Sequence, residues 1–247
     1  MSKRLIYISF LLALLLLSYC AVLCFPSFLF ENVHKNENIY IYSDETFPDN
    51  IELLSRRILH RVRTSGYYDR SEIYRVYISN DGFRWKFLSN RLSGSGGVNY
   101  TLFRGNSFIR PSNIGENRII APGNGLADAE VRDLVYFISH EIAHGMMAKK
   151  QGVFYSFASI PHWLTEGYAD HVAKATFDFD KNLEQFISNE WRLSAESGLY
   201  VRYHLMLLYL LDYKGLSLEQ IMANPPNEKA ILSELKILGK NLAKQSP

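Results

Sequence analysis

The sequence predicts an α+β protein that follows a membrane-crossing helix. Three observations support this: an uncharged apolar run near the start of the chain, short alternating segments up to about residue 125, and longer segments of helical periodicity after it. Strands first and helices afterwards are typical of the α+β class. With 47% hydrophobic and 21% charged residues, the composition is that of a globular protein and excludes a disordered or fibrous one.

The chain begins with a basic tip and an apolar run. Lys3 and Arg4 precede residues 5–25, 21 positions without a charge. As a helix of about 1.5 Å per residue, this run would cross a bilayer core of about 30 Å. A cleaved signal has a shorter apolar core and a small-x-small cleavage site, and neither is clear here, so we predict an uncleaved anchor over residues 1–30, with a cleaved, secreted form as the alternative. Because basic flanks stay in the cytoplasm, residues 31–247 are expected to form one extracytoplasmic domain of a single-pass protein.

Before residue 125, the predicted elements are mostly strands. A helix is expected over residues 49–63, where Ile51, Leu54 and Ile58 recur on one face. The glycine-rich residues 93–97 indicate a flexible loop, because no helix follows to form a phosphate site. The strands are predicted at residues 38–43, 73–79 and 83–88, with a further strand or hairpin from 108–110 and 117–121.

After residue 125, helical periodicity dominates. Three helices are predicted at about residues 128–150, 162–176 and 199–213, and a last amphipathic segment follows Asn227. In the first of these, apolar residues recur at helical spacing and should face the core.

Charge and cysteine content exclude several classes of protein. The 27 Lys and Arg residues against 25 Asp and Glu leave a net charge of +2, which does not support binding of nucleic acid. The two cysteines, Cys20 and Cys24, both lie in the apolar run. A disulfide scaffold and a cysteine-ligated metal are therefore excluded for residues 31–247.

The strongest chemical signal is the pentapeptide His140-Glu141-Ile-Ala-His144, inside the first predicted helix. Two His four residues apart lie on adjacent turns, about 40° from each other around the axis, and can hold one ion together. Glu141 is offset from the pair, so its carboxylate can reach a water beside the ion without ligating it. Two His alone cannot hold zinc firmly, because a catalytic site uses three protein ligands and a water position. Without a third ligand, the pattern would be an ordinary helix with solvated side chains.

A third ligand is offered by the helix predicted after Pro161. Glu166 and Asp170 are four residues apart and therefore share a face. Glu166 can bind the ion, and Asp170 can then accept the free N–H of a ligand His. His162 and His171 compete for the same role, although a structural role is the more usual one for each.

The segments HEIAH and WLTEGYADHVA resemble the gluzincin metallopeptidases, in particular the broad set called peptidase MA-like. That set pairs H-E-x-x-H with a downstream W-L-x-E-G-x-A motif, and the resemblance covers about residues 130–220. It implies a zincin-like α+β fold with a mostly antiparallel N-terminal sheet. It also implies Zn²⁺ held by His140, His144 and Glu166, and hydrolysis of peptide bonds with Glu141 as general base.

The segment after residue 199 is also similar to the helix that follows in that set. Tyr200, Tyr203 and His204 lie at helical spacing on one face, and the resemblance favours Tyr200 as the residue that stabilises the oxyanion. The resemblance in fold also implies that a peptide substrate would lie antiparallel along an edge strand near residues 117–121.

Two other classes of protein are alternatives. One is a catalytically inactive zinc-binding ectodomain that acts as a binding or envelope structural module, and the intact Glu141 argues against it. The other is a structural protein with an accidental motif, and the coincidence of Glu166 with Asp170 argues against that. The prediction is therefore a membrane-anchored zinc metallopeptidase that acts on peptides or proteins outside the cytoplasm.

Overall fold

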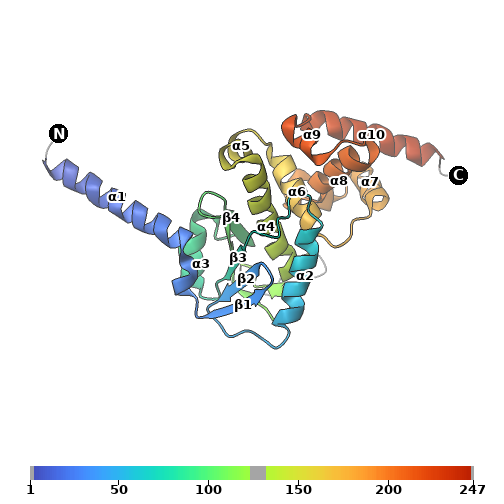
Figure 1. Cartoon of the computed structure of the whole chain (residues 1–247). Helices are drawn as coiled ribbons and strands as arrows, with labels where there is room; N and C mark the ends of the chain where they lie inside the picture. The colour runs from blue at the N-terminus through green and yellow to red at the C-terminus, as the bar shows by residue number, and fades with distance from the viewer. Residues whose placement is uncertain (1–2, 123–131, 246–247) are drawn as a thin grey trace. The chain divides into compact units, whose positions relative to one another are not determined.

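The structure is a computed structural model that describes residues 3–122 and 132–245 (Figure 1). The chain divides into two compact units, Met1–Leu59 with Asp69–Gly145, and His60–Tyr68 with Met146–Pro247. Helices α2 (Ile51–Arg63) and α4 (Leu134–Gln151) contribute residues to both. The described residues contain ten α-helices and a five-stranded sheet, so the predicted α+β class is confirmed.

The first unit contains the sheet, in the order β1-β2-β3-β5-β4. The pairs β1–β2 and β4–β5 are antiparallel, whereas β2–β3 and β3–β5 are parallel. The sheet is therefore mixed, and the expectation of a mostly antiparallel sheet is wrong. Helix α2 joins β2 to β3, and such crossover connections make neighbouring strands parallel. The strands are β1 (Asn32–Asn36), β2 (Ile39–Ser43), β3 (Tyr74–Ile78), β4 (Gly97–Tyr100) and β5 (Asn106–Ile109).

The strand predicted at residues 83–88 is instead part of helix α3 (Gly82–Ser89). Asp81 caps this helix, because its carboxylate accepts hydrogen bonds from two backbone N–H groups of the first turn at 2.8 and 3.3 Å. A six-residue apolar pattern suits a short helix as well as a strand, and the cap decides between them. Trp85 and Leu88 of α3 are buried in the core.

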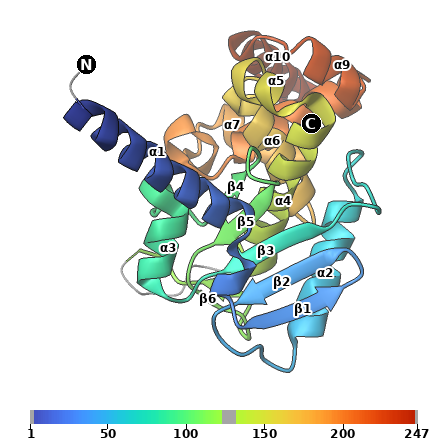
Figure 2. The same cartoon turned by 60° about the vertical axis from the view of Figure 1, so that its left-hand side comes forward.

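Each face of the sheet carries a helix (Figure 2). On one face, the ring of Tyr77 stacks on Phe108 with centroids 5.3 Å apart, and Trp85 of α3 joins the same hydrophobic cluster. On the other face, His34 Nε2 of β1 lies 3.0 Å from Ser55 Oγ of α2. The sheet is thus covered on both sides, as its parallel strands require.

Helix α1 (Lys3–Cys24) is the one helix in the described ranges that is long and apolar enough to cross a membrane, with a mean hydropathy of 2.5. A signal sequence near the start of a chain meets the same criterion. The last turn of α1 belongs to the folded unit, because Leu23 is 2% exposed and packs in a cluster with Phe30. The Asn106 side chain donates hydrogen bonds to the carbonyl oxygens of Leu23 and Cys24 at 2.8 and 3.2 Å. Both Leu23 and Phe30 fall within residues 1–30, the segment predicted to be the anchor.

Residues 108–110 and 117–121 do not pair with each other. The first segment overlaps β5, while β7 (Arg118–Ile119) pairs with β6 (Ser112–Asn113) in a separate two-stranded sheet. The helix predicted from about Asp128 starts at Leu134 in the structure, and residues 128–131 lie outside the described residues.

The second unit is helical in its described residues. The helix predicted at residues 162–176 is α6, and the one at 199–213 is α8 followed by a π-helical segment, Tyr209–Tyr213. A Cβ at Gly167 of α6 would lie 2.6 Å from the Tyr203 carbonyl oxygen, so a glycine is needed for α8 to pack this closely. The α-helices are α5 (Val153–Ala158), α6 (His162–Ala173), α7 (Phe179–Ile187), α8 (Val201–Leu208), α9 (Leu218–Ala223) and α10 (Glu228–Gln245).

Candidate metal centre

Helix α4 begins where two polar side chains bind its first N–H groups. Asn117 Oδ1 accepts from the N–H of Val135 at 3.0 Å, and Asp133 Oδ1 accepts from the N–H of Tyr136 at 2.7 Å. These contacts satisfy backbone donors that have no partner within a helix. They fix the start of α4, and therefore the position of each side chain that follows along it.

His140 and His144 lie on successive turns of α4, as the sequence predicted. Their Nε2 atoms are 3.2 Å apart, and their rings are nearly perpendicular, at 83°. His140 is buried, with the ring of Tyr136 5.6 Å from its own, while His144 is half-buried. The two rings therefore direct one nitrogen each to the same small volume.

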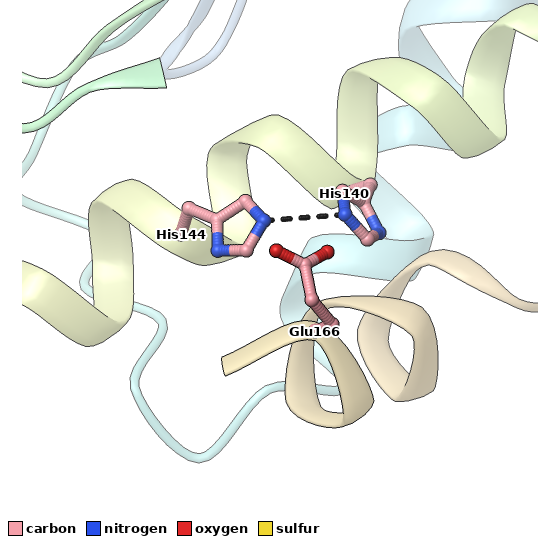
Figure 3. A group of neighbouring side chains, drawn as sticks. All are labelled: His140, His144 and Glu166. Carbon is pink, nitrogen blue, oxygen red and sulfur yellow. Dashed lines mark hydrogen bonds between the residues drawn. The ribbon is translucent and has the colours of Figure 1, made fainter. Parts of the chain in front are cut away.

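Glu166, on α6, extends its carboxylate toward both imidazoles (Figure 3). One ligand atom from each of His140, His144 and Glu166 lies within 4.8 Å of the other two. In the part of the chain that the structure describes, this is the one group of three such side chains able to hold a metal ion. The three predicted ligands are thus brought together.

The donor set fits a divalent cation such as zinc. Zinc binds imidazole nitrogen and carboxylate oxygen at about 2.0–2.2 Å with tetrahedral angles, which places two ligand atoms about 3.4 Å apart. The Nε2 separation of 3.2 Å in this pair is close to that value. Two nitrogens and one oxygen, with a fourth position left for water, are typical of catalytic rather than structural zinc sites.

Glu141 is buried against the first residue of β4. A Cβ at Gly97 would lie 2.7 Å from Glu141 Cγ and 3.0 Å from its Oε1. A Cβ at Gly96 would lie 2.2 Å from the ring of Phe137. Strand β4 therefore passes directly over α4 and needs glycine at both positions. Residues 93–97 were expected to form a flexible loop, and the adjacent glycines were the signal for this close approach.

The edge strand that contacts Glu141 is β4. It stands at the end of the strand order in the five-stranded sheet, whereas β7 belongs to the two-stranded sheet with β6. The expectation of an edge strand near residues 117–121 is therefore wrong for the five-stranded sheet. The strand order could not be predicted from pattern, because it is set by pairings between distant segments, such as Val76 with Ser107.

Asp170 is fully buried on α6, and its cationic partner is Lys174. Its Oδ2 atom accepts from His204 Nδ1 at 3.0 Å and from Lys174 Nζ at 3.1 Å. A carboxylate can only accept, so His204 carries its proton on Nδ1. The predicted hydrogen bond from a metal-binding imidazole to Asp170 stays a prediction.

His204 continues this network to His171. His171 Nδ1 lies 3.1 Å from His204 Nε2. Burial lowers the pKa of His204 and lowers the pKa of His171 to about 4, so both rings are neutral at pH 7. Because His204 Nε2 then accepts, His171 Nδ1 is the donor. No pattern in the sequence predicts this contact, since the two residues are 33 positions apart.

Tyr200 and Tyr203 stack on each other, with ring centroids 6.3 Å apart, and both lie beside the exposed imidazole of His162. His162 Nδ1 is 3.7 Å from Glu166 Oε1, and its ring centroid is 6.2 Å from Tyr200 and 5.8 Å from Tyr203. Tyr200 precedes α8 and has a left-handed φ of 58°, which is unusual for a tyrosine. Of the three residues expected on one helix face, the two tyrosines lie together, and His204 lies in the buried network instead.

Comparisons with known proteins supply no family for this chain. No model of a protein family matches it, and a search of curated proteins finds no match. Function is therefore inferred from the residues themselves.

Proposed function

We propose that the chain is a membrane-anchored, zinc-dependent metallopeptidase. The observation that supports it most directly is the convergence of His140, His144 and Glu166 on one volume. A carboxylate, Glu141, follows the first ligand immediately and is held in a buried position. Three ligands plus a positioned carboxylate are the parts that a hydrolytic metal site requires.

The chain's own residues then have separable roles. A bound zinc ion would supply a Lewis acid and lower the pKa of water. Glu141 accepts the proton of the attacking water and donates it to the departing amine. Packing against Gly97 restrains this carboxylate, which keeps it in reach of the reacting atoms. Tyr200, with Tyr203 beside it, donates a hydrogen bond to the oxyanion.

Strand β4 favours a peptide as the substrate. An edge strand can pair its outer backbone groups with an extended peptide. Because β4 crosses α4 at Glu141, a peptide paired with β4 would hold a carbonyl carbon beside the general base. The predicted peptide-binding edge thus moves from residues 117–121 to β4.

Helix α1 supports attachment to a membrane rather than secretion. Leu23 and Phe30 are core residues of the first unit, so cleavage beyond them would remove part of the folded core. The basic Lys3 and Arg4 favour a cytoplasmic start and an extracytoplasmic domain.

The test uses the full chain purified in detergent, since a start at residue 31 would delete Leu23 and Phe30 from the core. We expect Glu141→Gln to bind zinc as the parent does and to lose peptide cleavage by about 10²–10⁴-fold, because only the proton transfer is removed. Bound zinc is measured by elemental analysis, and cleavage by release of fluorescence from a quenched peptide library. Equal turnover by the variant and the parent would reject Glu141 as the base.

The same experiment separates the alternative function. An inactive zinc-binding ectodomain would bind zinc in the parent and cleave nothing in the library. Absence of bound zinc in the parent at neutral pH would reject both readings of the site.

A further inference from the structure

We propose that α3 and the turn after it rest in the interface of the membrane that α1 crosses. The contact surface, here called the α3 rim, consists of Lys86, Phe87, Arg91 and Leu92. Its partner is the lipid surface, with phosphate headgroups at the cations and acyl chains at the apolar side chains. The inference rests on the membrane-anchor part of the proposed function and is independent of the peptidase chemistry.

The exposed part of α1, residues 3–18, is too short to cross a bilayer alone. Residues 3–18 are exposed throughout, whereas Tyr19 and Leu23 pack on the hydrophobic cluster of the first unit. Sixteen residues at about 1.5 Å each cover about 24 Å, while the hydrocarbon core is about 30 Å thick and needs about 20 residues. Counted from Leu5, about 20 residues end at Cys24. The edge of the hydrocarbon therefore falls where the folded unit already surrounds α1.

Helix α3 lies beside α1 at that depth. The Arg84 guanidinium lies over the ring of Phe30, 5.5 Å from its centroid, just beyond the end of α1. Near the other end of α3, the ring of Phe87 is 5.2 Å from that of Tyr19, and its carbonyl oxygen accepts from the Tyr19 hydroxyl at 2.9 Å. Helix α3 therefore lies beside the C-terminal end of α1, and its own C-terminal end approaches Tyr19 (Figures 1 and 2).

The composition of the α3 rim suits a membrane interface. Phe87 is 42% exposed and Leu92 is 53% exposed, next to a helix that is itself apolar. The rim contributes two cations, Lys86 and Arg91, whereas Arg84 of the same helix is paired with Asp44 at 2.7 Å. Lys and Arg at this depth extend their charged ends to the headgroups, where anionic lipids attract them. In a bilayer, acyl chains cover the apolar side chains of the α3 rim, and phosphate headgroups neutralise its cations.

The test measures the depth of single labels on the full chain in vesicles of phosphatidylcholine and phosphatidylglycerol. In a Cys20→Ala, Cys24→Ala background, Leu92→Cys carries an environment-sensitive fluorophore. The matched control is Val33→Cys, an equally apolar side chain, 48% exposed, on β1. Figures 1 and 2 show β1 beyond the C-terminal end of α1. Thermal unfolding of each labelled chain checks that the fold is kept.

We expect a lipid-borne nitroxide to quench the label at position 92 severalfold more than the label at position 33, and iodide in the water to do the reverse. Equal iodide quenching at both positions, in chains that resist carbonate extraction, would overturn the rim and leave the anchor intact. Protection of position 92 from both quenchers would mean that protein covers it, which also overturns the proposal. Extraction by carbonate would remove the anchor and the rim together, and zinc binding and cleavage would still test the peptidase separately.

Discussion

Two clusters in this chain contain the same residue types but differ in how their side chains are arranged. His140, His144 and Glu166 are two imidazoles and a carboxylate, and so are His171, His204 and Asp170. The distance between the paired ring nitrogens is nearly the same, 3.2 Å in the first cluster and 3.1 Å in the second. A close pair of histidines is therefore not by itself a sign of a metal site.

The position of the carboxylate distinguishes the two clusters. Glu166 approaches the nitrogens by which the two imidazoles face each other, so three donors surround one volume. Asp170 instead binds the far nitrogen of His204 and is also bound by Lys174. The second cluster is a linear chain in which the facing atoms already bond to one another. The first cluster could therefore hold a metal ion, whereas the second is already satisfied by its own hydrogen bonds.

The largest expected effect comes from replacing one histidine by glutamine in each cluster and comparing the two variants. His144→Gln should weaken zinc binding by more than about a hundredfold, since the loss of a direct ligand exceeds the 10–100-fold loss typical of outer partners. His204→Gln should change zinc affinity by less than about tenfold and lower the free energy of unfolding by about 1–3 kcal/mol, because buried Asp170 loses its hydrogen bond. Competition with a chelating dye measures the first quantity, and urea unfolding of the metal-free chain measures the second. If His204→Gln releases zinc as completely as His144→Gln, the distinction between the clusters is wrong.

A smaller effect should appear as a pH dependence of stability. The folded pKa of His171 is about 4 and its ordinary value is 6.5, so below pH 6.5 the unfolded chain takes up the proton first. This residue's contribution is fully present above pH 6.5 and falls by about 3 kcal/mol as the pH drops to 4. Urea unfolding with a chelator present, at several pH values, should give a flatter acid side for His171→Gln than for the parent. Identical slopes in the two chains would show that His171 is not buried as a neutral ring.

The smallest effect sharpens the role of β4 at the metal cluster. The Cβ in Gly97→Ala would push on Glu141 and displace its carboxylate, with zinc retained and kcat reduced by about 10–100-fold. Gly94→Ala is the matched control, because a Cβ there meets nothing within 4 Å. A peptide-cleavage assay on both variants gives the comparison. Equal loss of kcat in the two would mean that the glycine-rich segment acts only through its flexibility.

The sequence predicted the metal cluster better than its surroundings. The spacing of His140 and His144 is local to one helix, and Glu166 follows in a helix of recognisable start, so both could be predicted from pattern. The hydrogen-bond network of Asp170, His204 and His171 could not be predicted, because its contacts join residues more than 30 positions apart. No periodicity in one segment reports which distant segment will pack on it.

The errors in the sheet have a similar origin. The alternation in residues 83–88 suits either element, and the Asp81 carboxylate selects the helix. That choice changes a hairpin into a crossover, and with it the direction of neighbouring strands. The parallel pair β2–β3, however, follows from α2, a helix that the sequence did predict. The sheet type was therefore missed mainly because strand pairing joins segments far apart in the chain.

The packing of the last turn of α1 against the first unit also limits where the chain could be cut without loss of its core. Proteolysis just after Cys24 would take away the buried Leu23 side chain, worth about 1.5–3 kcal/mol, and the two carbonyls bound by Asn106. Shedding from the membrane and loss of the native fold would then be one event. If α1 is the anchor proposed above, an activity of this chain would be confined to the membrane and would end on release from it.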